Sequence, residues 1–323
     1  MIMKKRLLGC FVLLIALTFL SPFSGQAGAA YPEKPITMII PQSAGGGTDG
    51  IARAIASRLE KALGVPVVVS NEDGAGGRRA SIVLFKSQPD GYTIGMPHFA
   101  ALLYDEVLGG TPPPIEYKKF AVLMRADTTI FFIHVNKKSP FKTLQDFKTA
   151  GKPIRFASSG VGTPSWLQPA ALSAYMGFRP VFVTGHKSLS EAALAVARGD
   201  LDAATGSYTH FQGVLEDVRP LVYMSDQRSH LLPEVPTIVE AGYPKLASMG
   251  VPWVFAAPPG TPAANMNILR TAMTKITASE EFVTWAKKQG YNPSSQGPDA
   301  FWKSFADMEE VYKSIKPLMA EKK

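Results

Sequence analysis

The segment Pro41–Asp49, Pro-Gln-Ser-Ala-Gly-Gly-Gly-Thr-Asp, has the residue types that could hold a small anion. It follows the apolar run Ile36–Ile40 and opens a helical pattern whose apolar stripe begins at Ile51. A strand, a glycine turn and a helix in this order aim unpaired backbone N–H groups and the positive end of the helix dipole at one point. The glycines allow a ligand to touch the backbone directly, because no side chain stands in the way.

The composition of this loop also excludes some ligands. It lacks the Lys-Ser/Thr pair of a phosphate-binding P-loop and the spacing of a dinucleotide fingerprint, so a small carboxylate is expected rather than a nucleotide. The alternative for a single loop of this kind is a tight turn that binds nothing.

Two further loops argue against that alternative. The segments Arg155–Pro164 and Val183–Ser188 again run from a strand-like stretch through small residues into a helix. In open α/β sheets, ligands sit beyond the carboxyl ends of strands, where such loops gather. We therefore expect loops from two hinged lobes to close on one ligand from opposite sides.

Several side chains near these loops could add to binding by the backbone. Asp49 is expected to orient the first loop, and as a first-turn acid it also complements the helix dipole. Lys187 and Arg78 are candidate counter-charges for a second carboxylate, with a solvated surface cation as the alternative for each. His186 could tune affinity below neutral pH or could point to solvent. Histidines and acids show no metal-ligand spacing and no serine has an evident base, so we expect no metal, no cofactor and no catalytic group.

Residues 1–30 have the pattern of a secretory signal. The cations Lys4–Arg6 precede the apolar run Leu7–Leu20, and a small-residue tail ends at Ala30, where cleavage is expected. The apolar run is too short to span a bilayer, and no later segment is long and apolar enough to do so. The one cysteine of the chain, Cys10, lies in this signal, so the mature chain is expected to have no thiol or disulfide chemistry.

The charge of the chain is mildly basic. The formal net charge is +8 for the whole sequence, and about +5 remains once the three cations of the signal are removed. The excess is spread out, which fits attraction of small anions, whereas a nucleic-acid partner would require a concentrated basic stripe.

The mature chain alternates strand-like and helix-like segments, which is typical of α/β proteins with largely parallel sheets and helices on both faces. The strand-like segments are Ile36–Ile40, Val65–Val69, Thr93–Met96, Ile154–Ala157, Val181–Thr184 and Leu201–Ala204. The helix-like segments are those ending at Leu63, Ala75–Lys86, Ser188–Arg198 with a capping box and the stop glycine Gly199, Glu280–Lys288 and Pro298–Ile315.

The tail of the chain reads as helical and without strands of its own, so it must pack on another lobe. The first lobe is the natural host. We therefore expect residues 31–133 plus 256–323 to form one lobe and residues 134–255 to form the other. The chain would cross between them near Ile133–Asn136 and near Trp253–Pro258, and two crossings make a hinge.

An ordered set of motifs covers nearly the whole mature chain. They are Tyr31–Ile36, Pro41–Asp49, Gly64–Val69, Gly74–Gly77, Pro89–Thr93, Ser158–Thr163, Val235–Thr237 and Phe255–Pro262. In this order they resemble the periplasmic solute receptors of tripartite tricarboxylate transporters, the TctC or Bug type.

The resemblance implies a two-lobed Venus-flytrap fold of the periplasmic-binding-protein kind, each lobe a doubly wound, mainly parallel sheet. It also implies a function. The chain would be a periplasmic, monomeric receptor, not an enzyme, that hands a small carboxylate to integral-membrane transporter subunits and does not itself span the membrane.

The resemblance further implies ligand-binding residues, because in that family two loops hold a ligand carboxylate through backbone groups and ordered water. Carried over to this chain, they are Ser43, Ala44, Gly45, Gly46, Gly47, Thr48 and Asp49 in the first loop and Ser158, Ser159, Gly160, Gly162, Thr163 and Ser165 in the second. The stretch Gly185-His186-Lys187 matches a third family motif in changed form, and Asp202 matches the acid at the entry of a later strand.

The chain departs from the family pattern at three positions. Trp166 stands where a histidine is common, Arg78 where an asparagine is usual, and Gly206 where many relatives carry an acid. An acid at that last position could meet a ligand amine, so its absence argues against an amino-acid ligand. Trp166 and Phe99 could instead flank a larger or aromatic ligand, and the alternative for Trp166 is packing between lobes.

The leading functional hypothesis is thus a carrier of small organic carboxylates. A second is a sensor subunit that binds the same solutes and reports to a signalling partner. A third is a secreted hydrolase or lyase that uses the same cleft, and the missing catalytic constellation speaks against it.

Overall fold

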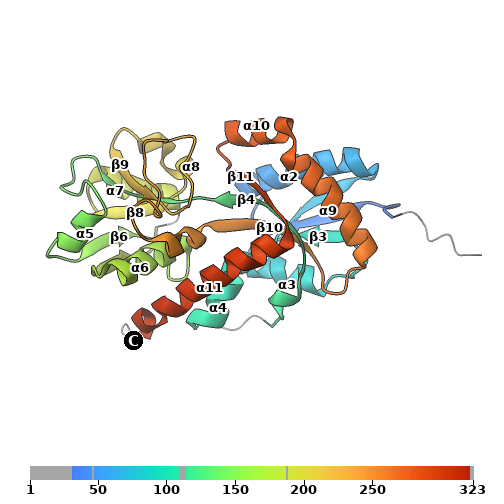
Figure 1. Ribbon diagram of the computed structural model, residues 1–323, viewed down its shortest axis with the longest axis horizontal. Coiled ribbons are helices and arrows are strands. Elements are labelled where there is room, and N and C mark those ends of the chain that lie inside the picture. The colour runs from blue at the N-terminus through green and yellow to red at the C-terminus, as the bar shows by residue number, and fades with distance from the viewer. Residues whose placement is uncertain (1–30, 46, 110–113, 187, 321–323) are drawn as a thin grey trace, which may run out of the picture. The chain divides into compact units, whose positions relative to one another are not determined.

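The computed structural model describes residues 31–45, 47–109, 114–186 and 188–320. The expected signal segment and the candidate residues Gly46 and Lys187 lie outside the described residues. Lys34–Lys323 form one compact unit built on two β-sheets, which Figure 1 shows with their helices.

The first sheet has six strands in the order β11-β4-β10-β3-β1-β2. Their bounds are β1 (Ile36–Ile40), β2 (Val67–Asn71), β3 (Thr93–Gly95), β4 (Ala121–Thr129), β10 (Val251–Ala257) and β11 (Pro293–Gln296). β1 pairs in parallel with both β2 and β3, so the carboxyl ends of these three strands lie at one edge of the sheet. β10 runs antiparallel to β3 and β4, and β11 runs antiparallel to β4.

Helices on both sides bury this sheet. They are α2 (Gly47–Leu63), α3 (Arg78–Lys86), α4 (Phe99–Leu108), α9 (Ala263–Ala278), α10 (Glu280–Lys288) and α11 (Pro298–Ala320). α2 packs on α9 along one side, and α3 and α4 lie on the other side in Figure 1. Ile36, Met38 and Ile40 on one face of β1 are fully buried and Ile39 on the other face is 5 % exposed, as expected for a strand covered on both faces. The stripe predicted for α2 is also confirmed, since Ile51 and Ile55 are fully buried.

The second sheet has five strands in the order β7-β6-β8-β5-β9. Their bounds are β5 (Phe132–Asn136), β6 (Ile154–Ala157), β7 (Pro180–Val183), β8 (Ala203–Gly206) and β9 (Val218–Tyr223). Its helices are α5 (Gln145–Thr149), α6 (Pro164–Met176), α7 (Leu189–Arg198) and α8 (Tyr208–Phe211). β6 is parallel to β7 and β8, so the loops after β6 and β7 leave from the same edge.

The ends of α7 follow the predicted signals. Ser188 is its N-cap, and its Oγ accepts a hydrogen bond from the backbone N–H of Glu191 at 3.2 Å. Gly199 ends the helix with φ of 84°, a left-handed conformation that favours glycine. The predicted serine cap and glycine stop are therefore confirmed.

Both sheets are mixed, although we expected them to be mainly parallel. The α/β architecture with two sheets is confirmed, and the parallel pairs are those around β1 and β6. The antiparallel pairs involve β4, β5 and β10, the strands nearest to the points where the chain passes from one sheet to the other. Strands that carry a chain out of one sheet and back have no crossover helix to impose a parallel direction.

Sheet membership places the crossings slightly off the predicted positions. β4 ends at Thr129 in the first sheet and β5 begins at Phe132 in the second, so the first crossing is at residues 130–131. Ile133 belongs to the second sheet, and the whole of Val251–Ala257 belongs to the first. The return crossing therefore lies before Val251.

The tail contacts the first sheet through α9, α11 and β11, and it is not free of strands. β11 lies within it and pairs with β4, which corrects the purely helical prediction. Its sequence, Pro-Ser-Ser-Gln, has no apolar alternation, so periodicity gives no strand signal there. α11 packs against α4 and also against α6 and the short helix η4 (Pro244–Met249).

Candidate functional site

Asp49, in the first turn of α2, is the centre of the first loop. Its carboxylate is 3 % exposed, and its Oδ2 accepts hydrogen bonds from the backbone N–H of Gly45 and from Nε of Arg53, both at 2.9 Å. Its Oδ1 accepts a third from Nδ2 of Asn71 at 3.0 Å. The hydrogen bond from Arg53 is the main reason why the pKa of Asp49 falls to about 2.

Through this network Asp49 connects the first loop with α2 and β2. All three donors lie in the protein, so the carboxylate is already satisfied without a ligand amine. Asn71 also donates to the backbone carbonyl of Gln42 at 2.8 Å, which ties the end of β2 to the loop after β1.

The exposed part of the loop offers groups for a ligand. Ser43, Ala44 and Gly45 are exposed, and Gly45 has φ of 85°, a left-handed conformation that glycine adopts readily. Thr48 is 2 % exposed and its Oγ1 is buried with no hydrogen-bond partner among the described residues. A buried hydroxyl without a partner at a helix N-terminus is costly unless a ligand or water completes it.

A second segment at the same edge follows β2. The hydroxyl of Ser43 donates to the carboxylate of Asp73, which joins the two loops. Gly77 lies so close to His98 that a Cβ atom built on it would be 2.9 Å from Cδ2 of the imidazole. The ends of β1, β2 and β3 therefore meet in one small area.

Arg78, a candidate counter-charge, already has a carboxylate partner. Its Nε and NH2 donate to the two oxygens of Asp105 at 2.5 and 2.7 Å, and Asp105 is buried on α4. A bidentate pair of this kind is specific in geometry and hard to open for another anion. The structure thus gives Arg78 the role of fixing α3 to α4.

The second loop, after β6, is a cluster of four hydroxyl groups. Oγ of Ser165 lies 3.2 Å from Oγ of Ser158, 3.1 Å from Oγ of Ser159 and 2.9 Å from Oγ1 of Thr163. The backbone N–H of Ser159 donates to Oγ of Ser165 at 3.1 Å. Ser158 and Ser165 are fully buried, so they shape the loop, while Ser159 and Thr163 are half-buried and accessible.

Gly162 of the same loop contacts Tyr104 of α4, a helix that covers the first sheet. A Cβ built on Gly162 would lie 2.6 Å from Cζ of Tyr104 on α4, and Gly162 has φ of 80°. Gly160, at φ of 152°, is the other glycine that lets the chain turn before α6. Only glycine fits where the loop meets Tyr104, so the approach of these two parts depends on the absence of a side chain.

The third loop follows β7. Gly185 has φ of 103°, and His186 is half-buried with an Nε2 atom that is buried and has no partner among the described residues. The backbone N–H of Ser158 donates to the carbonyl of Val183 at 3.0 Å, so the second and third loops start side by side. Lys187 lies outside the described residues.

Three predicted residues contact protein groups in this structure: Phe99 and Trp166 lie in the core, and Asp202 is paired with Arg155. Phe99 is 1 % exposed and packs against Phe301 and Phe120 in the core, and Trp166 is buried with its ring 4.9 Å from that of Phe182. Both rings face protein, because α4 and α6 turn them into the cores beneath the sheets. Asp202 accepts from the backbone N–H of Arg155 at 2.9 Å and from its Nε at 3.1 Å, which joins β6 to β8.

The sequence did not point to several residues that build the loops. Arg53, Asn71, Asp73 and Tyr104 hold or shape the candidate site. Arg53 carried a visible signal, since it lies four residues after Asp49 on one helix face. The other three are distant in sequence from their partners and were not detectable by spacing.

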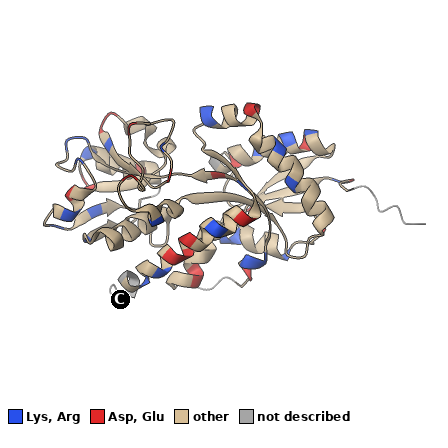
Figure 2. Ribbon diagram, in the orientation of Figure 1, with Lys and Arg blue, Asp and Glu red and all other residues tan. Residues whose placement is uncertain are grey.

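The arrangement offers backbone and hydroxyl donors but little chemistry. No group of three histidine, cysteine or acidic side chains that could hold a metal occurs in the described part of the chain. Charged side chains of both signs are interspersed along the helices in Figure 2. Among the helices that the structure describes, none has the length and apolarity that a bilayer crossing demands.

Comparisons with known proteins agree on one family. Residues 51–316 match the model of the tripartite tricarboxylate transporter family receptor, TctC. A UPF0065 protein from the tcbD–tcbE intergenic region of a Pseudomonas strain is 30 % identical over 293 residues, which cover 88 % of this chain and 86 % of that protein.

Solved structures share the fold. A TctC solute-binding protein from Polaromonas is 26 % identical with a TM-score of 0.75, covering 88 % of this chain and 98 % of its own. The R. palustris protein Rpa4515, solved with adipate, is 24 % identical with a TM-score of 0.70, covering 88 % of this chain and 98 % of its own, and it supports the two-lobed fold alone. The Polaromonas relative is a solute-binding protein, and the chain belongs to the tripartite tricarboxylate transporter receptor family, whose members are periplasmic binding proteins.

Proposed function

We propose that this chain captures a small organic carboxylate between the loop after β1 and the loops after β6 and β7, and delivers it to the membrane subunits of a tripartite tricarboxylate-type transporter. The observation that carries the proposal is a pair of unsatisfied buried atoms. Thr48 Oγ1 at the start of α2 and His186 Nε2 in the third loop are buried polar groups without hydrogen-bond partners among the residues that the structure describes.

The charges around the loops favour an anion held by neutral donors. Asp49 is paired with Arg53, so it offers no free carboxylate to a ligand amine. Arg78 is paired with Asp105, so it offers no free guanidinium to a ligand carboxylate. Each hydrogen bond from a neutral donor to a carboxylate contributes about 1.5–3 kcal/mol, and three or four of them suffice for micromolar binding.

Gly206 supports the exclusion of amino acids. A Cβ built on it would lie 2.4 Å from Cε2 of Phe211, so the position that could carry an acid for a ligand amine is closed to any side chain. Rpa4515, which shares the fold, was solved with adipate, and dicarboxylates are therefore the first class to test.

The direct test is a thermal-shift and calorimetric screen of the mature protein against acetate, benzoate, adipate, malate and citrate. We expect at least one of them to bind, and Thr48→Val to weaken that binding by about ten- to hundred-fold, as expected for loss of one hydrogen bond to a charged ligand. Thr48→Val should leave folding intact, because the hydroxyl that it removes has no hydrogen-bond partner in the described part of the chain.

The matched control is Thr271→Val, the same chemical change at an exposed position on α9. Binding equal in Thr48→Val and the wild type, or no binding across the panel, would contradict the site. Delivery is tested separately: deletion of the gene should abolish uptake of the bound carboxylate, and the Thr48→Val gene should restore it only at high solute concentration.

A further inference from the structure

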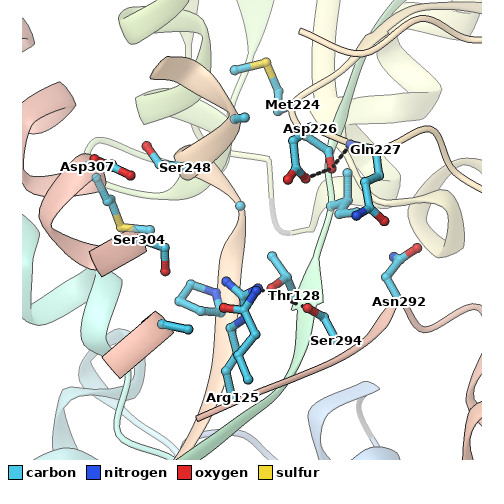
Figure 3. Close-up of a pocket in the computed structure, with 18 of the residues that line it drawn as sticks. Arg125, Thr128, Met224, Asp226, Gln227, Ser248, Asn292, Ser294, Ser304 and Asp307 are labelled. Atoms are coloured by element: carbon cyan, nitrogen blue, oxygen red, sulfur yellow. Dashed lines mark hydrogen bonds between the residues drawn. The ribbon is translucent and has the colours of Figure 1, made fainter. Parts of the chain in front are cut away.

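A cavity of about 970 Å³ lies apart from the proposed carboxylate loops. Those loops follow β1 and β2 at one end of the first sheet's strand order and β6 and β7 at one end of the second. The cavity is lined from the opposite ends, by β4 and β11 and by the segment after β9, with α11 and η4 closing it (Figure 3). No described residue of the three loops is among its lining residues.

An irregularity in β4 turns the side chains of Arg125 and Thr128 toward this cavity. In a regular strand, Arg125 and Asp127 would share one face and Thr128 would lie on the opposite face. The register between β4 and β10 shifts at Ala126. The register between β4 and β11 also shifts between Arg125 and Asp127. One extra residue in a strand re-aims the side chains on either side of it. Arg125 and Thr128 consequently both line the cavity.

Arg125 brings a positive charge with no ion-pair partner within 4 Å in the described part of the chain. Its NH2 donates to Oγ of Ser294 at 3.0 Å, and its Nε is buried with no acceptor. Burial lowers the pKa of the guanidinium, opposed by the more distant carboxylates of Asp226 and Asp127. A planar anion would accept hydrogen bonds from the N–H groups of this partly buried guanidinium that have no acceptor in the described part of the chain.

Two more unsatisfied atoms line the same cavity. Thr128 Oγ1 and Gln296 Oε1 are buried and have no hydrogen-bond partner among the described residues. A carbonyl oxygen such as Oε1 requires a donor, which a carboxylate cannot supply but a hydroxyl can. The ligand should therefore carry hydroxyl groups as well as a negative charge.

The other charged side chains of the cavity are of both signs. Arg228 and Lys245 are paired with Glu240 and Glu310, and the exposed Lys287 and Lys303 also line the cavity. Asp226 and Asp307 also line the cavity, as Figure 3 shows, and would repel a polyanion. Their carboxylate oxygens can instead accept hydrogen bonds from hydroxyl groups.

We propose that this cavity binds a polyhydroxylated monocarboxylate, a ligand of the sugar-acid class, with its carboxylate on Arg125 and its hydroxyl groups on Gln296, Asp226 and Asp307. The volume is within the range of small-molecule sites. The site is independent of the carboxylate loops, so one protein would have two ligand sites with different chemistry.

The test follows the Nε–H signal of Arg125 by NMR during titration with D-gluconate, assigned by its loss in Arg125→Gln. Two probes separate the recognised groups: hexanoate has the carboxylate without hydroxyls, and sorbitol has the hydroxyls without the charge. We expect gluconate to shift the signal and to bind at least ten-fold more tightly than either. Gln296→Met should reduce the preference for gluconate over hexanoate by about five-fold, the loss expected for one hydrogen bond.

Two controls separate the cavity from other sites. Arg179→Gln makes the same change on an exposed arginine outside the cavity and should bind gluconate as the wild type does. Thr48→Val should also keep gluconate binding, because it changes only the first loop. An unmoved Arg125 signal, equal binding of hexanoate, binding of inorganic phosphate in place of gluconate, or loss of gluconate binding in Thr48→Val would each overturn the proposal.

Discussion

At the residue scale, the carboxylate of Asp49 accepts hydrogen bonds from three protein donors. It connects the loop after β1, through the N–H of Gly45, with α2 through Arg53 and with β2 through Asn71. A loop made of glycine and small residues has little packing of its own, so one buried acceptor with three donors decides its shape.

Asp49→Asn should therefore loosen the loop. The amide keeps one acceptor oxygen but replaces the other with a donor that faces Arg53 and Gly45. We expect the free energy of unfolding to fall by about 1–3 kcal/mol, because the guanidinium and the N–H lose a charged acceptor. Urea denaturation at pH 7 measures it, and carboxylate affinity should fall in the same variant.

The matched control is Asp200→Asn, the same change at an exposed position after α7. A loss of stability no larger than that of this control would mean that the loop holds its shape without the Asp49 network.

At the element scale, close contacts between backbone and aromatic rings set the spacing of strands and helices. Gly206, the last residue of β8, lies against the fully buried ring of Phe211 in α8. A side chain there must displace a ring that has no free volume around it.

Gly206→Asp tests that contact and the ligand class together. The new Cβ would start 2.4 Å from the Phe211 ring, so we expect a loss of about 1–3 kcal/mol in unfolding free energy from overpacking and from burial of a charge. Gly213→Asp is the control, since a Cβ there meets nothing within 4 Å. An aspartate tolerated at both positions, with new amino-acid binding in Gly206→Asp, would remove the argument against an amino-acid ligand.

Prediction from the sequence succeeded where a signal is local. The apolar stripe of α2, the Ser188 cap and the Gly199 stop all depend on residues a few positions apart. The strand β11 was not predicted, because its side chains show no strand pattern and its partner strand β4 is more than 160 residues earlier in the sequence. Phe99 could not be assigned to a cleft or to the core, since an aromatic residue after a strand fits both until its neighbour Phe301 is known.

The same limit applies to the candidate site. The small residues of the three loops could be identified because the residues of each glycine-rich turn between a strand and a helix are adjacent in the sequence. The partner of Arg78 could not, because Asp105 lies 27 residues away on another helix. Charge compensation of this kind decides which cations remain for a ligand, and it is visible only in three dimensions.

At the scale of the whole molecule, the junction of β4, β10 and β11 contains a carboxylate of unusual environment. Asp127 is 1 % exposed and pairs across to Trp253 in β10 and Pro293 in β11. Its Oδ1 accepts from the backbone N–H groups of Thr128 at 2.7 Å and Asn292 at 3.0 Å. Burial nevertheless dominates and raises its pKa from 3.8 to about 7.

The two buried acids should give the stability of the protein opposite pH dependences. Asp49 has a lowered pKa, so its contribution is present above about pH 4 and is lost as the pH falls toward 2. Asp127 has a raised pKa, so its contribution is fully present below about pH 4 and is lost as the pH rises toward 7. Between these limits the folded protein holds a proton on Asp127 that the unfolded chain releases.

Asp127→Asn should therefore remove a decline in stability between pH 4 and pH 7. The amide oxygen can keep both backbone hydrogen bonds, and the amide has no proton to release. At about 1.4 kcal/mol per pKa unit, the difference in unfolding free energy between variant and wild type should grow in favour of the variant by a few kcal/mol over this range. Urea denaturation at pH 4.5, 5.5, 6.5 and 7.5 measures it, with Glu216→Gln, an exposed acid, as the control. A difference that stays constant across the series would mean that Asp127 is ionised at the strand junction throughout, and that its backbone donors outweigh its burial.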